Sequence, residues 1–93
     1  MTKLHAHTML KPSASVYSRA FGDELVLLDF GLGEYFGLDP IGAESWRLLE
    51  QGRSLGEIAK ELEGRYVVAY EDALRDVTAL VASMCERGLV MPC

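Results

Sequence analysis

The sequence predicts an α+β domain in which a three-stranded antiparallel sheet is followed by three helices. Two patterns carry this prediction. Residues 16–38 contain short β-prone runs separated by glycine-containing turns, which is typical of hairpins. From Asp39 onward, apolar residues recur at intervals of three and four, as they do in amphipathic helices. A chain of 93 residues has room for one hydrophobic core, so we expect a single domain.

The N-terminal end is expected to lie outside this domain. Residues 1–15 show no sustained period and include Pro12, which is typical of an arm or a frayed end. We therefore expect a flexible arm over residues 1–15 and the folded domain over residues 16–93.

The sheet is predicted from three short runs. VYSRAF and ELVLLDF flank Gly22-Asp23, a strong turn signal that predicts a β-hairpin over residues 16–30. A second turn, GLG, leads into EYFGL, which fits a third strand over residues 34–38. If the third strand pairs only with the second, it lies at the edge of the sheet, and one row of its backbone groups has no partner.

Two helices joined by a tight turn should follow. Asp39 can cap the first helix and Pro40 is tolerated in its first turn, while Gly52 supplies the left-handed residue that ends it. Ser54 and Glu57 form a capping box at the start of a second, short helix.

The third helix is predicted from about Glu71 to Arg87, after an irregular stretch over residues 65–69. Its apolar stripe consists of Ala73, Leu74, Val77, Leu80, Val81 and Met84. Gly88 ends it, and we expect the apolar residues that follow to pack back onto the core.

Composition narrows the function classes. The net charge of −5 opposes binding to nucleic acid and to acidic membranes, and no apolar run is long enough for a signal sequence or a membrane span. We therefore expect a cytoplasmic protein. Cys85 and Cys93 lack a CxxC spacing or a second pair, so we expect reduced thiols without a metal.

A search for catalytic groups finds no complete set. His5 and His7 could bind a metal, but no third ligand has a suitable spacing. Cys85 has no histidine after it that could activate a thiolate. We therefore expect no enzyme activity, no metal and no cofactor.

Residues 40–64 have the outline of a helix-turn-helix, which raises DNA binding as an alternative. The second helix carries Lys60, with Arg65 at its end, but these two cations face three acids, Glu57, Glu61 and Glu63. Peptide binding fits better, because an edge strand beside an apolar helix can accept an extended peptide as an additional strand. Core packing is the structural alternative for the same apolar residues.

The order of these elements, together with particular residues, resembles the PqqD-like family. The resemblance covers residues 16–90. It is most specific in YFGLDPIG ahead of the helix with Trp46, in GRSLGEIA, and in Asp76-Val77 followed by the closing ERGLV. The resemblance implies a winged helix-turn-helix with three strands and three helices, which agrees with the pattern above.

The resemblance further implies a function: residues 16–93 are a recognition domain for the leader region of a ribosomally made precursor peptide. The leader would dock as an additional strand on the third strand and against the third helix. Carried onto this chain, the site comprises Glu34, Tyr35, Phe36, Gly37 and Leu38 on the strand, and Ala73, Asp76, Val77, Leu80 and Met84 on the helix.

Within the family, the chain most resembles the stand-alone recognition protein of lasso-peptide pathways. That resemblance implies an adaptor that presents the precursor to a leader peptidase and a macrocyclase. The alternative within the family is the chaperone of pyrroloquinoline quinone biosynthesis, which serves a radical SAM enzyme. A homodimer through the free edge strand is a further expectation.

Overall fold

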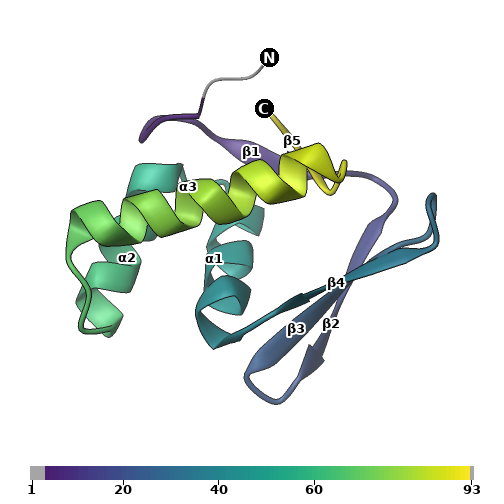
Figure 1. The fold of residues 1–93 in the computed structure, drawn as a ribbon, viewed down its shortest axis with the longest axis horizontal. Coiled ribbons are helices and arrows are strands. Elements are labelled where there is room, and N and C mark those ends of the chain that lie inside the picture. Colours follow the sequence, from purple (N-terminus) through teal and green to yellow (C-terminus); the bar gives the residue numbers. More distant parts are fainter. Residues whose placement is uncertain (1–3, 93) are drawn as a thin grey trace.

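The computed structural model describes residues 4–92, and Cys93, a predicted incidental thiol, lies outside them. A three-stranded sheet precedes three helices, and a small two-stranded sheet joins the two ends of the chain (Figure 1). In chain order the elements are β1 (Leu10–Pro12), β2 (Val16–Phe21), β3 (Glu24–Asp29), β4 (Glu34–Leu38), α1 (Pro40–Glu50), α2 (Leu55–Arg65), α3 (Tyr70–Glu86) and β5 (Val90–Pro92). The predicted α+β order of three strands followed by three helices is confirmed.

The three-stranded sheet is an antiparallel meander in the order β2-β3-β4. Gly22 and Gly33 adopt positive φ, of 63° and 71°, where the chain reverses between strands. In the register, Leu27 lies opposite Phe36, and Leu25 lies opposite Leu38. Because side chains alternate along a strand, these four residues share the face of the sheet that packs on the helices.

The helices begin where the sequence signals predicted. The Asp39 carboxylate accepts a hydrogen bond of 2.7 Å from the Gly42 N–H at the start of α1. Ser54 and Glu57 form the reciprocal capping box of α2, with bonds of 2.8 and 3.2 Å. The loop between α2 and α3 spans residues 66–69, close to the predicted irregular stretch.

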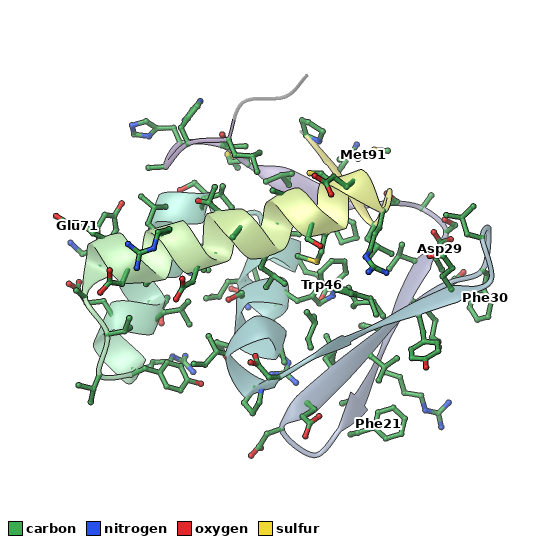
Figure 2. The ribbon with its side chains drawn as sticks, in the orientation of Figure 1. Phe21, Asp29, Phe30, Trp46, Glu71 and Met91 are labelled. Atoms are coloured by element: carbon green, nitrogen blue, oxygen red, sulfur yellow. The ribbon has the colours of Figure 1, made fainter. Side chains whose placement is uncertain are left out.

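One hydrophobic core lies between the inner face of the sheet and the helices. Trp46 of α1 lies in this core and is 1% exposed (Figure 2). The core also contains Leu89 and Val90, so the predicted return of the C-terminal tail onto the core is confirmed. No described helix combines the length and the apolarity needed to cross a membrane.

The expectation that residues 1–15 lack fixed structure is wrong for β1. Leu10–Pro12 pairs antiparallel with Val90–Pro92, and the Leu10 side chain is 1% exposed in the core. A three-residue strand has no measurable period, and its partner lies at the other end of the chain. Local sequence patterns therefore could not reveal this pairing.

The segment before β1 is also bound to the domain. The Ala6 and Thr8 carbonyls accept hydrogen bonds of 2.8 and 3.0 Å from the N–H groups of Gly56 and Leu55. These two donors lie in the first turn of α2, where backbone N–H groups have no partner within the helix. Residues 6–10 therefore belong to the same packed unit as the helices.

Candidate functional site

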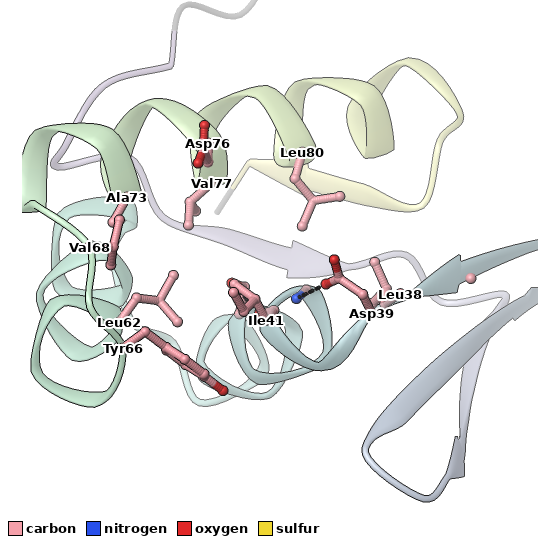
Figure 3. Close-up of a pocket in the computed structure, with 13 residues that line it drawn as sticks. Leu38, Asp39, Ile41, Leu62, Tyr66, Val68, Ala73, Asp76, Val77 and Leu80 are labelled. Carbon is pink, nitrogen blue, oxygen red and sulfur yellow. Dashed lines mark hydrogen bonds between the residues drawn. The ribbon is translucent and has the colours of Figure 1, made fainter.

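An apolar groove of about 350 Å³ opens between the end of β4, α1 and the N-terminal half of α3 (Figure 3). The α2–α3 loop closes one end of it. Its lining residues are Gly37, Leu38, Asp39, Ile41, Gly42, Ser45, Leu62, Tyr66, Val68, Ala73, Asp76, Val77 and Leu80. The walls are mainly aliphatic and aromatic, so the groove suits bulky apolar side chains of a ligand.

Two carboxylates stand among these apolar walls, and their situations differ. The Asp39 carboxylate is engaged in capping α1. Asp76 is exposed on α3 and forms no ion pair with any residue in 4–92. Of the two, Asp76 is therefore the carboxylate available to a ligand cation.

The open edge of β4 runs beside this groove. β4 pairs with β3 on one side only, so the backbone groups on its other side have no strand partner among the described residues. Such an edge can accept an extended chain through backbone hydrogen bonds, while adjacent pockets receive alternate side chains. Among residues 4–92, only β4 combines a free edge with an apolar groove.

A smaller hollow lies at the opposite end of β4. It is lined by Asp29, Glu34, Tyr35, Phe36, Arg87 and Leu89. The guanidinium carbon of Arg87 lies 4.9 Å from the centre of the Phe36 ring, which is a cation–π contact. Arg87 therefore fixes the ring of Phe36 where α3 ends and β4 begins.

Most of the predicted site residues meet at these two places. Gly37, Leu38, Ala73, Asp76, Val77 and Leu80 line the groove, and Glu34, Tyr35 and Phe36 line the hollow. Met84 differs, because it is 0% exposed and lines neither of them. Its place is in the core between α3 and the sheet.

Tyr35 contributes differently from its two neighbours on β4. It alternates with Phe36 and Leu38, so its side chain points to the opposite face of the sheet and is 74% exposed. Its side chain therefore does not share the apolar face formed by Phe36 and Leu38. On β4, Gly37 and Leu38 line the groove, and Phe36 lines the hollow.

The structure adds groove residues that the sequence did not single out. Ile41, Leu62, Tyr66 and Val68 come from α1, α2 and the loop after α2. Ile41 is half exposed although its spacing fits the apolar face of α1. The sequence signal for Ile41 as a groove residue was its position, because it is an apolar residue in the first turn of a helix that follows an edge strand. Tyr66 and Val68 carried no periodic signal, because they lie in a loop.

A second apolar surface covers the outer face of the three-stranded sheet. Tyr17, Leu28 and Tyr35 lie in register across the three strands. Phe30 contacts Tyr17 edge to face, with ring centres 5.1 Å apart. Phe21 and Phe30 project from the sheet, away from the helices (Figure 2). We call Tyr17, Phe21, Leu28, Phe30 and Tyr35 the outer aromatic patch.

The described residues contain few groups suited to catalysis, metal binding or nucleic-acid binding. Burial raises the pKa of the Cys85 thiol, which disfavours the nucleophilic thiolate. No cluster of three metal-ligating side chains is present in residues 4–92. Arg53 and Arg65 at the two ends of α2 are paired with Glu57, Glu61 and Glu44, so few cations remain on this helix for a phosphate backbone.

Comparisons with known proteins agree with this geometry. The sequence model of the family described as "Coenzyme PQQ synthesis protein D (PqqD)" matches residues 24–90. A solved structure, TbiB1 in complex with the TbiA(beta) leader peptide, is 35% identical; the match covers 86% of this chain and 93% of that one, with a TM-score of 0.82. Lasso peptide synthetase B1, complexed with the leader peptide, is 32% identical over 89% of this chain and 98% of that one, with a TM-score of 0.83. No curated protein sequence matches the chain significantly.

Proposed function

Because the chain belongs to the PqqD family, we propose that it is a non-catalytic adaptor that binds the leader of a ribosomally made precursor peptide. The observation that carries this proposal is the free edge of β4 beside the apolar groove. Two similar structures, from proteins solved with leader peptides, support the same function. The adaptor would act in the cytoplasm, where ribosomal precursors are made.

Binding in this groove would combine backbone and side-chain interactions. The leader adds a fourth strand to the sheet through the free backbone groups of β4. Its side chains that point toward α3 enter the groove near Leu38, Val77 and Leu80. Each buried side chain of leucine or phenylalanine size contributes about 1.5 to 3 kcal/mol, so the apolar contacts dominate. An ion pair with exposed Asp76 adds only about 0.2 to 1 kcal/mol.

The adaptor is proposed to present the leader to a leader peptidase and a macrocyclase, as in lasso-peptide pathways. The outer aromatic patch supports a docking surface for the peptidase. Contiguous exposed apolar surface is uncommon on monomeric proteins and marks sites of association. Tyr35 belongs to this patch and also lies on the strand that would receive the leader. A partner on the patch would therefore lie next to the bound leader, which raises the local concentration of the precursor at the peptidase.

The alternative function within the family is a chaperone that serves a radical SAM enzyme. It would use the same groove for the leader but a different partner enzyme. The name of the matching family favours this alternative, whereas the similarity to lasso peptide synthetase B1 favours the lasso type. Binding of the unaltered chain to a peptidase or to a radical SAM enzyme, measured with the leader present, distinguishes the two.

Calorimetry with the leader segment of a precursor encoded beside the gene tests the adaptor function. We expect micromolar or tighter binding. Leu80→Asp should weaken it about tenfold or more, which corresponds to about 1.4 kcal/mol, because it places a charge in the apolar groove. Tyr17→Ala is the matched control, since this residue belongs to the outer aromatic patch on β2 and lines neither the groove nor the hollow.

The outcomes separate the candidate functions. Tyr17→Ala should bind the leader nearly normally but stimulate leader cleavage less when the peptidase is added. Equal losses of leader affinity in both variants would contradict the groove. If the leader does not bind, and duplex DNA binds with an affinity that falls steeply with salt, the chain is a DNA-binding regulator instead.

A further inference from the structure

An edge strand offers hydrogen-bond donors and acceptors but does not fix the position of an added strand. Backbone groups repeat along β4, so an added peptide can shift along it or run in either direction. Apolar pockets discriminate only partly between such alternatives, because many aliphatic side chains fit them. Charged groups at the two ends of the groove would set the position much more sharply, since an unpaired or like charge is unfavourable there.

Arg87 is such a group at the Glu34 end of β4. It is exposed, and it forms no ion pair with the acidic side chains of residues 4–92. The contact with the Phe36 ring holds its guanidinium at the rim. It is the only basic residue among those that line the groove or the hollow in the described part of the chain.

Asp76 is the matching group at the Leu38 end of β4. It lies eleven positions before Arg87, and α3 and its C-cap are helical over this stretch. Eleven residues make three helical turns with an offset of only about 20°, so the two residues lie on one face of the helix. The acid is therefore at one end of the leader site and the base at the other, both on the side that faces β4.

The separation of the two charges matches a short extended peptide. Eleven residues of helix extend about 16 Å, at about 1.5 Å per residue. An extended chain covers that length in about five residues, and side chains on one face recur every second residue. Two side chains of a peptide bound to β4 can therefore reach both charges if they lie about four or six positions apart in the peptide. β4 itself has five residues, which is the length over which pairing can occur.

We propose that Asp76 and Arg87 fix the direction and register of the leader strand by pairing with a basic and an acidic leader residue. This inference rests on the proposed function and specifies its substrate. The preferred leader carries one basic and one acidic side chain, about four or six positions apart, with apolar residues between them. The basic residue lies beside Leu38 and the acidic residue beside Glu34 and Phe36.

Selection from a displayed library of random peptides tests this proposal. The probe is the library itself, sorted separately on the unaltered protein and on the charge-exchanged variant Asp76→Lys/Arg87→Glu. The control is Asp72→Lys/Arg75→Glu, which exchanges an ion pair on the same helix whose residues line neither the groove nor the hollow. Both exchanges leave the net charge unchanged, and circular dichroism verifies that each variant is folded.

The unaltered protein and the control should enrich the same motif, with a basic and an acidic residue in a constant order. The exchanged variant should enrich the same apolar residues with the two charges interchanged, by tenfold or more over the original order. If the exchanged variant does not fold, Asp76→Asn and Arg87→Gln replace it, and each should lose one charge preference. Apolar enrichment without a charge preference, or with an order that the exchange leaves unchanged, overturns the proposal. If no peptide is enriched on the unaltered protein, the proposed function itself fails.

Discussion

Asp29 is the only ionisable side chain among residues 4–92 that is buried. Its carboxylate accepts hydrogen bonds from the Ser15 hydroxyl at 3.0 Å and from the Gly31 N–H at 2.9 Å. It lies at the end of β3, where the chain turns toward β4. These bonds replace the water that the buried carboxylate loses, and they fix the turn that positions the edge strand.

Asp29→Ala should lower the free energy of unfolding by about 1 to 3 kcal/mol, because the Ser15 hydroxyl and the Gly31 N–H lose the acceptor that fixes the turn. Asp29→Asn retains one acceptor oxygen and should lose less. Urea denaturation measures both values. Glu63→Gln is the control, because the Glu63 side chain is exposed and forms no ion pair within residues 4–92. If Asp29→Ala unfolds at the same urea concentration as this control, the carboxylate does not hold the turn.

Glu57 gives a prediction about pH. The hydrogen bond from the Ser54 backbone N–H lowers the pKa of the Glu57 carboxyl, with smaller contributions from the Ser54 hydroxyl and from Arg53. A lowered pKa means that the charged form stabilises the fold above the ordinary carboxyl pKa, and that this stabilisation is lost as the pH falls through the lowered value.

Glu57→Gln should therefore be less stable than the unaltered chain at neutral pH, and the difference should shrink as the pH falls through the lowered pKa of Glu57. Thermal unfolding between neutral pH and pH 3 measures it. The Glu63→Gln variant should show no such convergence. A Glu57→Gln difference that stays constant with pH would mean that the charge does not contribute.

Helix α2 contains two glycines in different surroundings. A Cβ added at Gly56 would lie 3.0 Å from the Ala6 carbonyl oxygen and 3.1 Å from the Tyr70 hydroxyl. A Cβ at Gly64 would meet nothing within 4 Å. Gly56 is therefore the point at which the N-terminal segment approaches the helix most closely.

Gly64→Ala should stabilise the protein by about 0.5 to 1 kcal/mol, because alanine favours the helix. Gly56→Ala should not, although it lies in the same helix, because the new methyl group displaces the segment around Ala6. Urea denaturation of the two variants side by side measures this difference. Equal stabilisation by both would show that the N-terminal segment does not pack closely on α2.

Elements with local signals were predictable, and elements that depend on distant partners were not. The capping groups Asp39 and Ser54 lie within three residues of the groups they bind, so the starts of α1 and α2 were evident from the sequence. β1 and β5 have only three residues each and pair across almost the whole chain.

The same distinction holds within the site. Strict alternation along β4 separates Tyr35 from Phe36 and Leu38, and this much follows from the sequence once the strand is known. That Arg87 stacks on Phe36 does not follow, because the contact depends on where the C-terminal end of α3 lies relative to β4.

The whole molecule is held together at its ends as well as in its core. Leu10 anchors β1 in the core, and the Ser13 N–H donates a 2.9 Å hydrogen bond to the Leu89 carbonyl next to β5. We call the β1–β5 pair with this bond the terminal clasp. It joins β1, near the start of the chain, to the segment that follows α3 (Figure 1).

Leu10→Ala should lower the free energy of unfolding by about 2 to 5 kcal/mol, because it opens a cavity in the core. Met9→Ala is the matched control, since the neighbouring Met9 side chain is 45% exposed and should cost little. Chemical denaturation measures both. Equal and small effects would mean that residues 1–15 behave as the flexible arm that the sequence suggested.

The terminal clasp also determines how the protein responds to tension. In the antiparallel register, Leu10 lies opposite Pro92, so both ends of the chain leave the pair on the same side. A force that pulls the two ends apart therefore acts on the interstrand bonds one after another, as when a zip is opened, rather than on all of them together in shear. Once the hydrogen bonds from Leu55 and Gly56 to Thr8 and Ala6 have broken, the clasp should be the next part to open under load. The three-stranded sheet would bear no load until the clasp had opened, so a peptide held on β4 should stay bound during the first stage of mechanical unfolding.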